Sequence, residues 1–182
     1  MFEGFTHTQV QANGITINLR YGGSGKPLLL LHGYPQTHVM WHKITPALAK
    51  KFSVVVPDLR GYGDSEKPLA DEGDHTVYCK RTTALDQAQI MTSLGFETFH
   101  LLGHDRGVRV GYRMALDFPE RVLSLTNFDV MPSQAAFENM DTPLSFAWFH
   151  WHLMRQPAPF PETMIHNSAR EYLDFLFDRW TA

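Results

Sequence analysis

The chain has 182 residues, enough for one folded domain with a core, and its 43% hydrophobic and 19% charged residues are ordinary for a globular protein. Its net charge of −3 at pH 7 gives no basic surface of the kind that nucleic-acid binding needs. No apolar run approaches the ~20 residues of a membrane helix, and residues 1–13 lack the apolar core of a signal peptide. The single cysteine, Cys79, excludes an internal disulfide, and we expect a cytoplasmic protein.

In the first two thirds of the chain, patterns typical of strands alternate with patterns typical of helices. Residues 6–10 and 15–20 alternate apolar and polar side chains around Asn13-Gly14, which predicts a β-hairpin. The elements expected next are a strand at 27–31, a helix at 41–51, a strand at 53–56, a helix at 82–94, a strand at 99–102, a helix at 107–117 and a strand at 122–130. This order predicts an α/β fold with a doubly wound, mostly parallel sheet behind an antiparallel start.

The character of the sequence changes after Pro132. Residues 137–180 are rich in aromatic side chains, contain three of the four tryptophans and have no strand-sized apolar run. We expect helices that form the start of a lid over a pocket, because aromatic side chains often line ligand sites. The predicted organisation is therefore a core at 1–132 and a lid segment at 133–182. The alternative is that these helices are ordinary outer-layer helices.

The most informative motif is Gly103-His104-Asp105-Arg106-Gly107, which lies between a predicted strand and a predicted helix. Glycines two residues before and after a central residue are typical of the nucleophile elbow, a sharp turn that exposes the central side chain. Serine at the centre would indicate acyl transfer, whereas aspartate indicates attack of a carboxylate on carbon and an ester intermediate. The alternative for Asp105 is a capping carboxylate in a tight turn.

A second motif, His32-Gly33-Tyr34-Pro35, follows the first buried strand. Glycine at its second position lets the backbone approach closely, so the Tyr34 N–H can face the elbow. Together with the N–H of Arg106, it would form an oxyanion hole with two donors. The alternative is a plain turn at the end of a strand.

Three motifs together resemble the α/β-hydrolase superfamily, and within it the branch with an aspartate nucleophile. They are His32-Gly33-Tyr34-Pro35, Asp58-Leu59-Arg60-Gly61-Tyr62-Gly63-Asp64-Ser65 and Gly103-His104-Asp105-Arg106-Gly107. The resemblance covers nearly the whole chain and is strongest to haloacetate (fluoroacetate) dehalogenases. It implies the N-terminal part of an α/β-hydrolase fold and hydrolytic dehalogenation of a short haloacid.

Two arginines follow the proposed nucleophile, whereas haloalkane dehalogenases and many epoxide hydrolases carry tryptophan directly after it. Arg106 and Arg109 are three residues apart and therefore share one face of the helix near its N-terminus. Cations there oppose the helix dipole, so a bound carboxylate would compensate them. The resemblance implies that both arginines bind the substrate carboxylate. For Arg109 the alternative is a surface salt bridge.

In haloacetate dehalogenases a His-Trp pair in the lid binds the departing halide, and the resemblance assigns this role to His150 and Trp151. An imidazole and an indole N–H are neutral donors suited to a halide in a dry pocket. The local sequence at 148–162 resembles the same family. Aromatic packing within the lid is the alternative for this pair.

Ester hydrolysis needs a histidine base and a carboxylate that orients it. Asp129 follows a predicted strand at the position of the catalytic acid in haloacetate dehalogenases, and a plain turn carboxylate is the alternative. The family's histidine follows two further strands, whereas the histidines after Asp129 lie at 150, 152 and 166 in the lid-like region. We therefore expect a C-terminally truncated chain that lacks the base, the last strands and the rest of the lid.

The ten histidines form no recognisable metal motif, so we expect no metal and no cofactor. The expected partner is a small haloacid, with no nucleic acid and no membrane, and a homodimer remains open. An epoxide hydrolase is the first alternative function, although the arginine after Asp105 suits an anion better than an epoxide. The second alternative is a non-catalytic fragment that at most binds small carboxylates.

Overall fold

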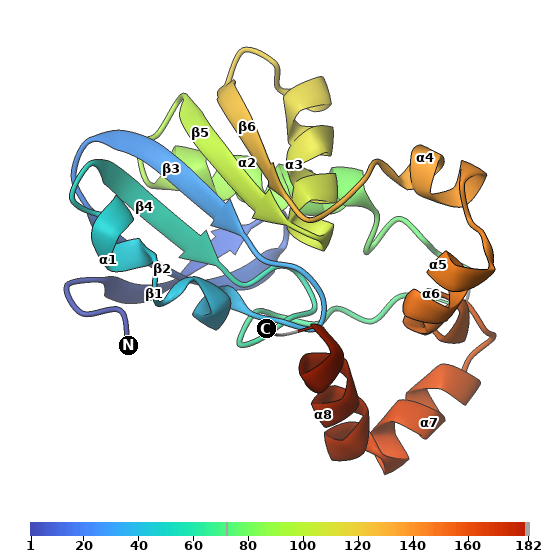
Figure 1. Ribbon diagram of the computed structural model, residues 1–182. Coiled ribbons are helices and arrows are strands. Elements are labelled where there is room, and N and C mark those ends of the chain that lie inside the picture. Colours follow the sequence, from blue (N-terminus) through green and yellow to red (C-terminus); the bar gives the residue numbers. More distant parts are fainter. Residues whose placement is uncertain (72, 181–182) are drawn as a thin grey trace. The chain divides into compact units, whose positions relative to one another are not determined.

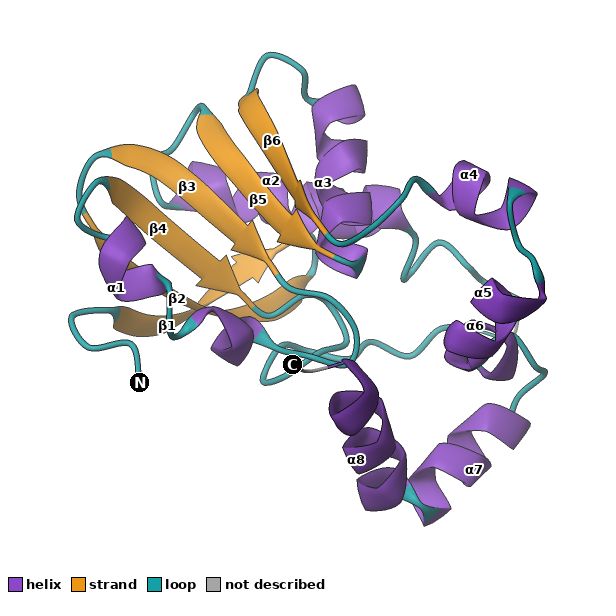
Figure 2. Cartoon of the chain, viewed as in Figure 1, coloured by secondary structure: helices purple, strands orange, loops and turns teal. Residues whose placement is uncertain are grey.

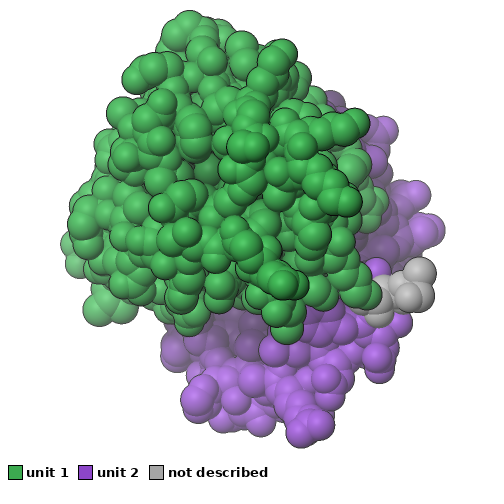
Figure 3. Space-filling view, turned by 90° about the vertical axis from the view of Figure 1, so that its left-hand side faces the viewer, with its two compact units in different colours: residues 1–130 green, residues 131–182 purple. Residues whose placement is uncertain are grey.

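The computed structural model describes residues 1–71 and 73–180 of the chain. The chain forms two compact units, Met1–Val130 and Met131–Ala182 (Figure 3). In the described part of the chain, no helix combines the length and the hydropathy that a membrane span requires.

The first unit is built around a mixed β-sheet, which the described residues show as six strands in the order β1-β2-β4-β3-β5-β6 (Figures 1 and 2). The strands are β1 (Thr6–Ala12), β2 (Ile15–Gly23), β3 (Lys26–Leu31), β4 (Phe52–Pro57), β5 (Phe99–His104) and β6 (Val122–Phe128). β2 pairs antiparallel with β1 and with β4, and β3 pairs parallel with β4 and β5, as does β5 with β6. The predicted fold class and the antiparallel start are both confirmed.

Helices cover both faces of this sheet. α2 (Lys80–Ser93) and α3 (Arg106–Asp117) lie on one face, while the 3-10 helix η1 (His38–Trp41) and α1 (Thr45–Leu48) pack on the other. The predicted helix at 41–51 was wrong in extent, because two short helices stand in its place. Pro46, which has no N–H to donate, lies in the first turn of α1 and starts a new helix there.

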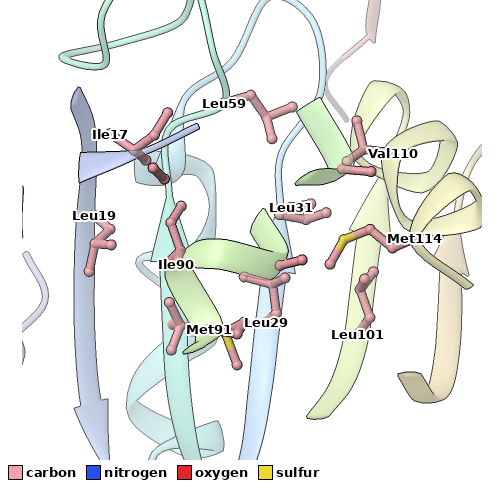
Figure 4. Packing of buried hydrophobic residues seen from close by; sticks show 14 of the residues in the cluster. Ile17, Leu19, Leu29, Leu31, Leu59, Ile90, Met91, Leu101, Val110 and Met114 are labelled. Atoms are coloured by element: carbon pink, nitrogen blue, oxygen red, sulfur yellow. The ribbon is translucent and has the colours of Figure 1, made fainter. Parts of the chain in front are cut away.

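The alternation of side chains along β3 explains why both faces are covered. Leu29 and Leu31 are fully buried in the cluster beneath α2 and α3, which Figure 4 shows with Met91 and Met114. Leu28 and Leu30 point to the opposite face and pack with Trp41. Full burial of each such side chain contributes about 1.5–3 kcal/mol. The strand ends that carry the site therefore rest on a core packed from two sides.

The second unit consists of short helices in its described residues, 131–180. They are α4 (Ser133–Glu138), α5 (Thr142–Ala147), α6 (Phe149–Leu153), α7 (Phe160–Asn167) and α8 (Ala169–Trp180). Phe149 of α6 packs edge-on against two rings of α8, with centroid distances of 5.7 Å to Phe175 and 6.3 Å to Tyr172. The aromatic residues that mark this stretch of sequence therefore join α6 to α8.

β6 is the last strand of the sheet in the described residues, and it pairs only with β5. Leu123 and Phe128 on it are 53% and 45% exposed. An unpaired edge with apolar side chains promotes association, so sedimentation should show self-association that grows with protein concentration. Leu123→Lys should weaken it, whereas Leu69→Lys, in an exposed loop, should not. A monomer at every concentration would contradict this prediction and the homodimer that we propose from it.

Candidate active site

Asp105 lies in a strained turn between β5 and α3. Its backbone adopts φ 47° and ψ −114°, a region that a non-glycine residue rarely occupies. Such strain persists only where the surroundings enforce it, and it is concentrated at functional sites. The turn thus has the geometry expected of a nucleophile elbow.

Close backbone contacts explain the glycines around this turn. A Cβ on Gly107 would lie 2.1 Å from the Leu31 carbonyl oxygen, and a Cβ on Gly33 would lie 2.5 Å from the Cβ of Asp105. Only glycine therefore lets α3 approach the end of β3 and lets the loop after β3 approach the Asp105 side chain.

The Asp105 carboxylate is held by the backbone of this loop. The Tyr34 N–H donates a hydrogen bond to Asp105 Oδ1 at 2.8 Å. The guanidinium carbon of Arg106 lies 5.1 Å from the centroid of the Tyr34 ring, in a cation–π contact. The structure therefore brings Tyr34, Asp105 and Arg106 together.

Three cationic side chains, those of Lys80, Arg106 and Arg109, lie close enough to Asp105 to interact with its charge. Burial lowers the pKa of Arg109, and Asp105 partly offsets this effect. Burial also lowers the pKa of Lys80, with further lowering by Arg106 and Arg109. Three cations around one carboxylate leave a net positive neighbourhood that favours a bound anion. Lys80 was missed in the sequence because no motif marks the first residue of α2.

His32 ties the two loops of the site together. Its Nε2 accepts a hydrogen bond from the Leu59 N–H at 2.9 Å, and its Nδ1 lies 3.0 Å from the Gly33 carbonyl oxygen. Burial lowers the pKa of His32 to about 4, so the ring is neutral near pH 7 and Nε2 stays an acceptor. The loop after β3 and the loop after β4 are therefore joined through one neutral ring.

The loop after β4 is anchored by a buried ion pair. Arg60 donates from Nε to Asp86 Oδ2 at 2.9 Å and from Nη2 to Oδ1 at 2.7 Å. Asn13 adds a hydrogen bond to the same carboxylate at 2.9 Å. Bidentate pairing of this kind fixes direction as well as distance, so it holds the loop against α2 and the β1–β2 hairpin.

A buried His–Asp pair in the same unit was not anticipated from the sequence. His38 Nδ1 lies 2.8 Å from Asp58 Oδ1, and Asn18 also donates to Asp58 at 2.9 Å. Burial raises the pKa of Asp58, but hydrogen bonds led by those from His38 outweigh burial and bring it to about 2. Since Arg20 Nε donates to His38 Nε2 at 3.3 Å, both ring nitrogens are engaged, and the pair is a structural one.

Asp129 follows β6 directly and lies beside the elbow in the sheet. The register pairs His104 with Phe128, so Asp105 and Asp129 are the first residues after two neighbouring strands. The Asp105 N–H also points to the Phe128 carbonyl oxygen at 3.5 Å. Asp129 is exposed and has a positive φ of 51°. This position suits a carboxylate at the carboxyl edge of the sheet.

His150 and Trp151 are neighbours on α6 in the second unit. His150 is buried, with its ring 4.8 Å from the ring of Trp180. Trp151 stacks on Trp148 at 4.8 Å and contacts Phe137 at 5.4 Å. These contacts belong to the aromatic packing of the second unit, and a role for the pair in halide binding stays a prediction.

Within the described residues, no group of three or more His, Cys, Asp or Glu side chains is arranged to hold a metal ion.

Comparison with known proteins identifies the family. The family model described as alpha/beta hydrolase fold matches residues 26–181. The chain belongs to this hydrolase family. The elbow geometry at Asp105 and the mostly parallel sheet agree with this membership.

Among relatives of this α/β hydrolase, fluoroacetate dehalogenase from Burkholderia sp is 51% identical over all 182 residues, which span 60% of that relative's length. Soluble epoxide hydrolase from Corynebacterium sp. (strain C12) is 42% identical over 127 residues, or 70% of this chain and 42% of that one. A crystal structure described as an α/β hydrolase from Nostoc sp PCC 7120 aligns with a TM-score of 0.96 at 47% identity, covering 99% of this chain and 62% of that one.

Proposed function

We propose that the chain carries the nucleophile and the carboxylate-binding groups of a hydrolytic dehalogenase for short haloacids such as fluoroacetate. The observation that supports this most is the strained Asp105, whose carboxylate accepts the Tyr34 N–H beside the cations Arg106, Arg109 and Lys80. A nucleophile beside a positively charged neighbourhood suits a substrate that carries a carboxylate next to its electrophilic carbon. The 51% identity to a fluoroacetate dehalogenase supports the same substrate class.

In the proposed first step, an Asp105 carboxylate oxygen attacks the carbon that bears the halogen. A carbon–oxygen bond forms, the carbon–halogen bond breaks, and the halide leaves with the bonding electron pair. Arg106 and Arg109 would hold the substrate carboxylate during this displacement. The imidazole of His150 and the indole N–H of Trp151 would donate to the departing halide, if residues 133–182 act as the lid that we propose.

In the proposed second step, water attacks the ester carbonyl carbon of Asp105, and the bond from that carbon to the ester oxygen of the substrate breaks. The hydroxy acid leaves, glycolate in the case of fluoroacetate, and the Asp105 carboxylate is restored. The N–H groups of Tyr34 and Arg106 would stabilise the oxyanion that forms, and Asp129 would orient the histidine that activates the water. Neither His32 nor His38 can act as this base, because hydrogen bonds engage both nitrogens of each ring. The histidines that follow Asp129 in this chain, His150, His152 and His166, lie in the lid-like segment and not after two further strands, so we propose that this chain by itself stops at the ester.

Epoxide hydrolysis is the second candidate, supported by the 42% identity to a soluble epoxide hydrolase over 127 residues. It would use the same aspartate, but it requires an acid that protonates the epoxide oxygen rather than cations that bind an anion. The grouping of Lys80, Arg106 and Arg109 near Asp105 therefore favours the haloacid. A third possibility is a fragment that binds carboxylates without reacting.

We propose the cytoplasm as the location of the protein. The free thiol of Cys79 agrees with this reducing compartment.

Fluoride release separates these functions. Incubation of the chain with fluoroacetate should release close to one equivalent of fluoride per chain and then stop, because the ester is not hydrolysed. Asp105→Asn should release none. Diol formation from an epoxide without any fluoride release would favour epoxide hydrolysis, and binding of glycolate without either product would favour the non-catalytic fragment.

A further inference from the structure

Tyr62 lies next to the site, yet neither proposed step uses it. It belongs to the loop after β4, where its N–H donates to the Leu59 carbonyl oxygen at 2.9 Å. Its ring packs edge-on against the His32 ring, with a centroid distance of 5.1 Å and an interplanar angle of 71°. The ring also packs against the buried core beneath α2 and α3.

The hydroxyl of Tyr62 reaches the first cation after the nucleophile. The Arg106 guanidinium lies near enough to this hydroxyl to interact with it and to lower the Tyr62 pKa in part. The same guanidinium lies over the Tyr34 ring at 5.1 Å. Arg106 therefore contacts one aromatic residue from each of the two loops that flank Asp105. A long, rotamer-rich side chain held at two points loses much of its freedom before a substrate arrives.

The support behind Tyr62 is rigid. His32, on which its ring rests, is hydrogen-bonded to the Leu59 N–H and lies against the Gly33 carbonyl oxygen. The bidentate pair between Arg60 and Asp86 anchors the same loop. The hydroxyl is consequently presented to Arg106 by groups that are themselves buried and paired.

The charge of the group that contacts Arg106 also affects how well Arg106 can bind an anion. A carboxylate at this place would orient Arg106 but cancel its charge, whereas a neutral hydroxyl orients the guanidinium and leaves the charge available to an anion. Burial raises the pKa of Tyr62 although Arg106 lowers it in part, so the hydroxyl stays neutral near pH 7.

We propose that Tyr62 is a positioning residue that directs the Arg106 guanidinium toward the substrate carboxylate and so sets the preference of the site for anions. This inference rests on the proposed function and deepens it. It predicts that loss of one hydroxyl selectively weakens binding of an anionic ligand.

Tyr62→Phe tests the proposal, because it keeps the ring that packs on His32 and removes only the hydroxyl. Glycolate and its neutral amide, glycolamide, serve as probes in calorimetry with the 182-residue chain. Glycolate should bind about tenfold more weakly to Tyr62→Phe, as expected for one hydrogen bond to a charged group, while glycolamide binding should not change. Tyr78→Phe is the matched control, since its hydroxyl donates to the Pro68 carbonyl oxygen at 2.7 Å, and both ligands should bind it as they bind the unaltered chain.

The outcomes separate the two proposals. Equal glycolate binding by the unaltered chain and by Tyr62→Phe would overturn the positioning role and leave the proposed function intact. Equal weakening of glycolate and glycolamide would reduce Tyr62 to a packing residue and overturn its role in anion preference. If the unaltered chain does not prefer glycolate to glycolamide, the proposed function fails, and the inference fails with it.

Discussion

Gly107→Ala should destabilise the fold by at least about 3 kcal/mol and abolish reaction at Asp105. The added methyl group would lie 2.1 Å from the Leu31 carbonyl oxygen and 2.7 Å from that of His32, and both are backbone atoms of a buried strand end. The contact could be relieved only by moving α3 away from β3, which would also remove the strained turn at Asp105. Urea unfolding followed by circular dichroism measures the loss of stability.

Gly95→Ala is the matched control for this substitution. Gly95 follows α2 at φ +81°, but a Cβ there meets no atom within 4 Å, so its cost is limited to backbone strain of about 1 kcal/mol. If Gly107→Ala and Gly95→Ala destabilise the chain equally, the close approach of α3 to β3 does not hold the elbow as described.

Arg109→Met should slow reaction of the chain with low concentrations of fluoroacetate by at least about tenfold, because it removes a charged hydrogen-bond donor from the substrate carboxylate. Methionine keeps much of the apolar stem of arginine, so packing along α3 is largely preserved. The rate of fluoride release, measured with an ion-selective electrode at increasing fluoroacetate concentrations, gives the effect.

Arg113→Met, one turn further along α3, is the control for charge and helix position. Arg113 donates from Nε to Asp117 Oδ2 at 2.7 Å, in a partly buried ion pair within α3. Its loss should change the rate by less than roughly twofold, because the Arg113 charge is paired with that of Asp117 and therefore acts little at a distance. Equal slowing by both substitutions would point to a general charge effect and argue against a specific role for Arg109.

The fold was largely predictable because the side-chain patterns have strong physical causes. β3 reads as a continuous apolar run since both of its faces are buried, and Asn13-Gly14 adopts the positive φ values of 48° and 78° that a tight hairpin turn needs. The helix expected at 41–51 failed because apolar spacing alone does not reveal that Pro46 starts a separate helix. The order of the strands in the sheet could not be predicted from the sequence either, because pairing between distant segments leaves no local pattern.

The elbow could also be predicted from the sequence. Its glycines are required by the close backbone contacts that any such turn makes, and they therefore leave a recognisable pattern. The contributions of Lys80, Tyr62 and the His38–Asp58 pair were not predictable. Each depends on segments far apart in the sequence that meet at the carboxyl ends of the strands. Asp58 and Tyr62 lie in the motif at 58–65, but that motif does not show what they contact. Only the packing of α2 and of the loop after β4 brings these side chains near Asp105 or its supporting loops.

Mass spectrometry of the chain after exposure to fluoroacetate tests the central claim most directly. The account predicts one covalent adduct per chain, the mass of a carboxymethyl ester, located by peptide mapping at Asp105 and absent from Asp105→Asn. A folded chain that shows no adduct and releases no fluoride, or one that is modified only at another residue such as Cys79, would contradict it.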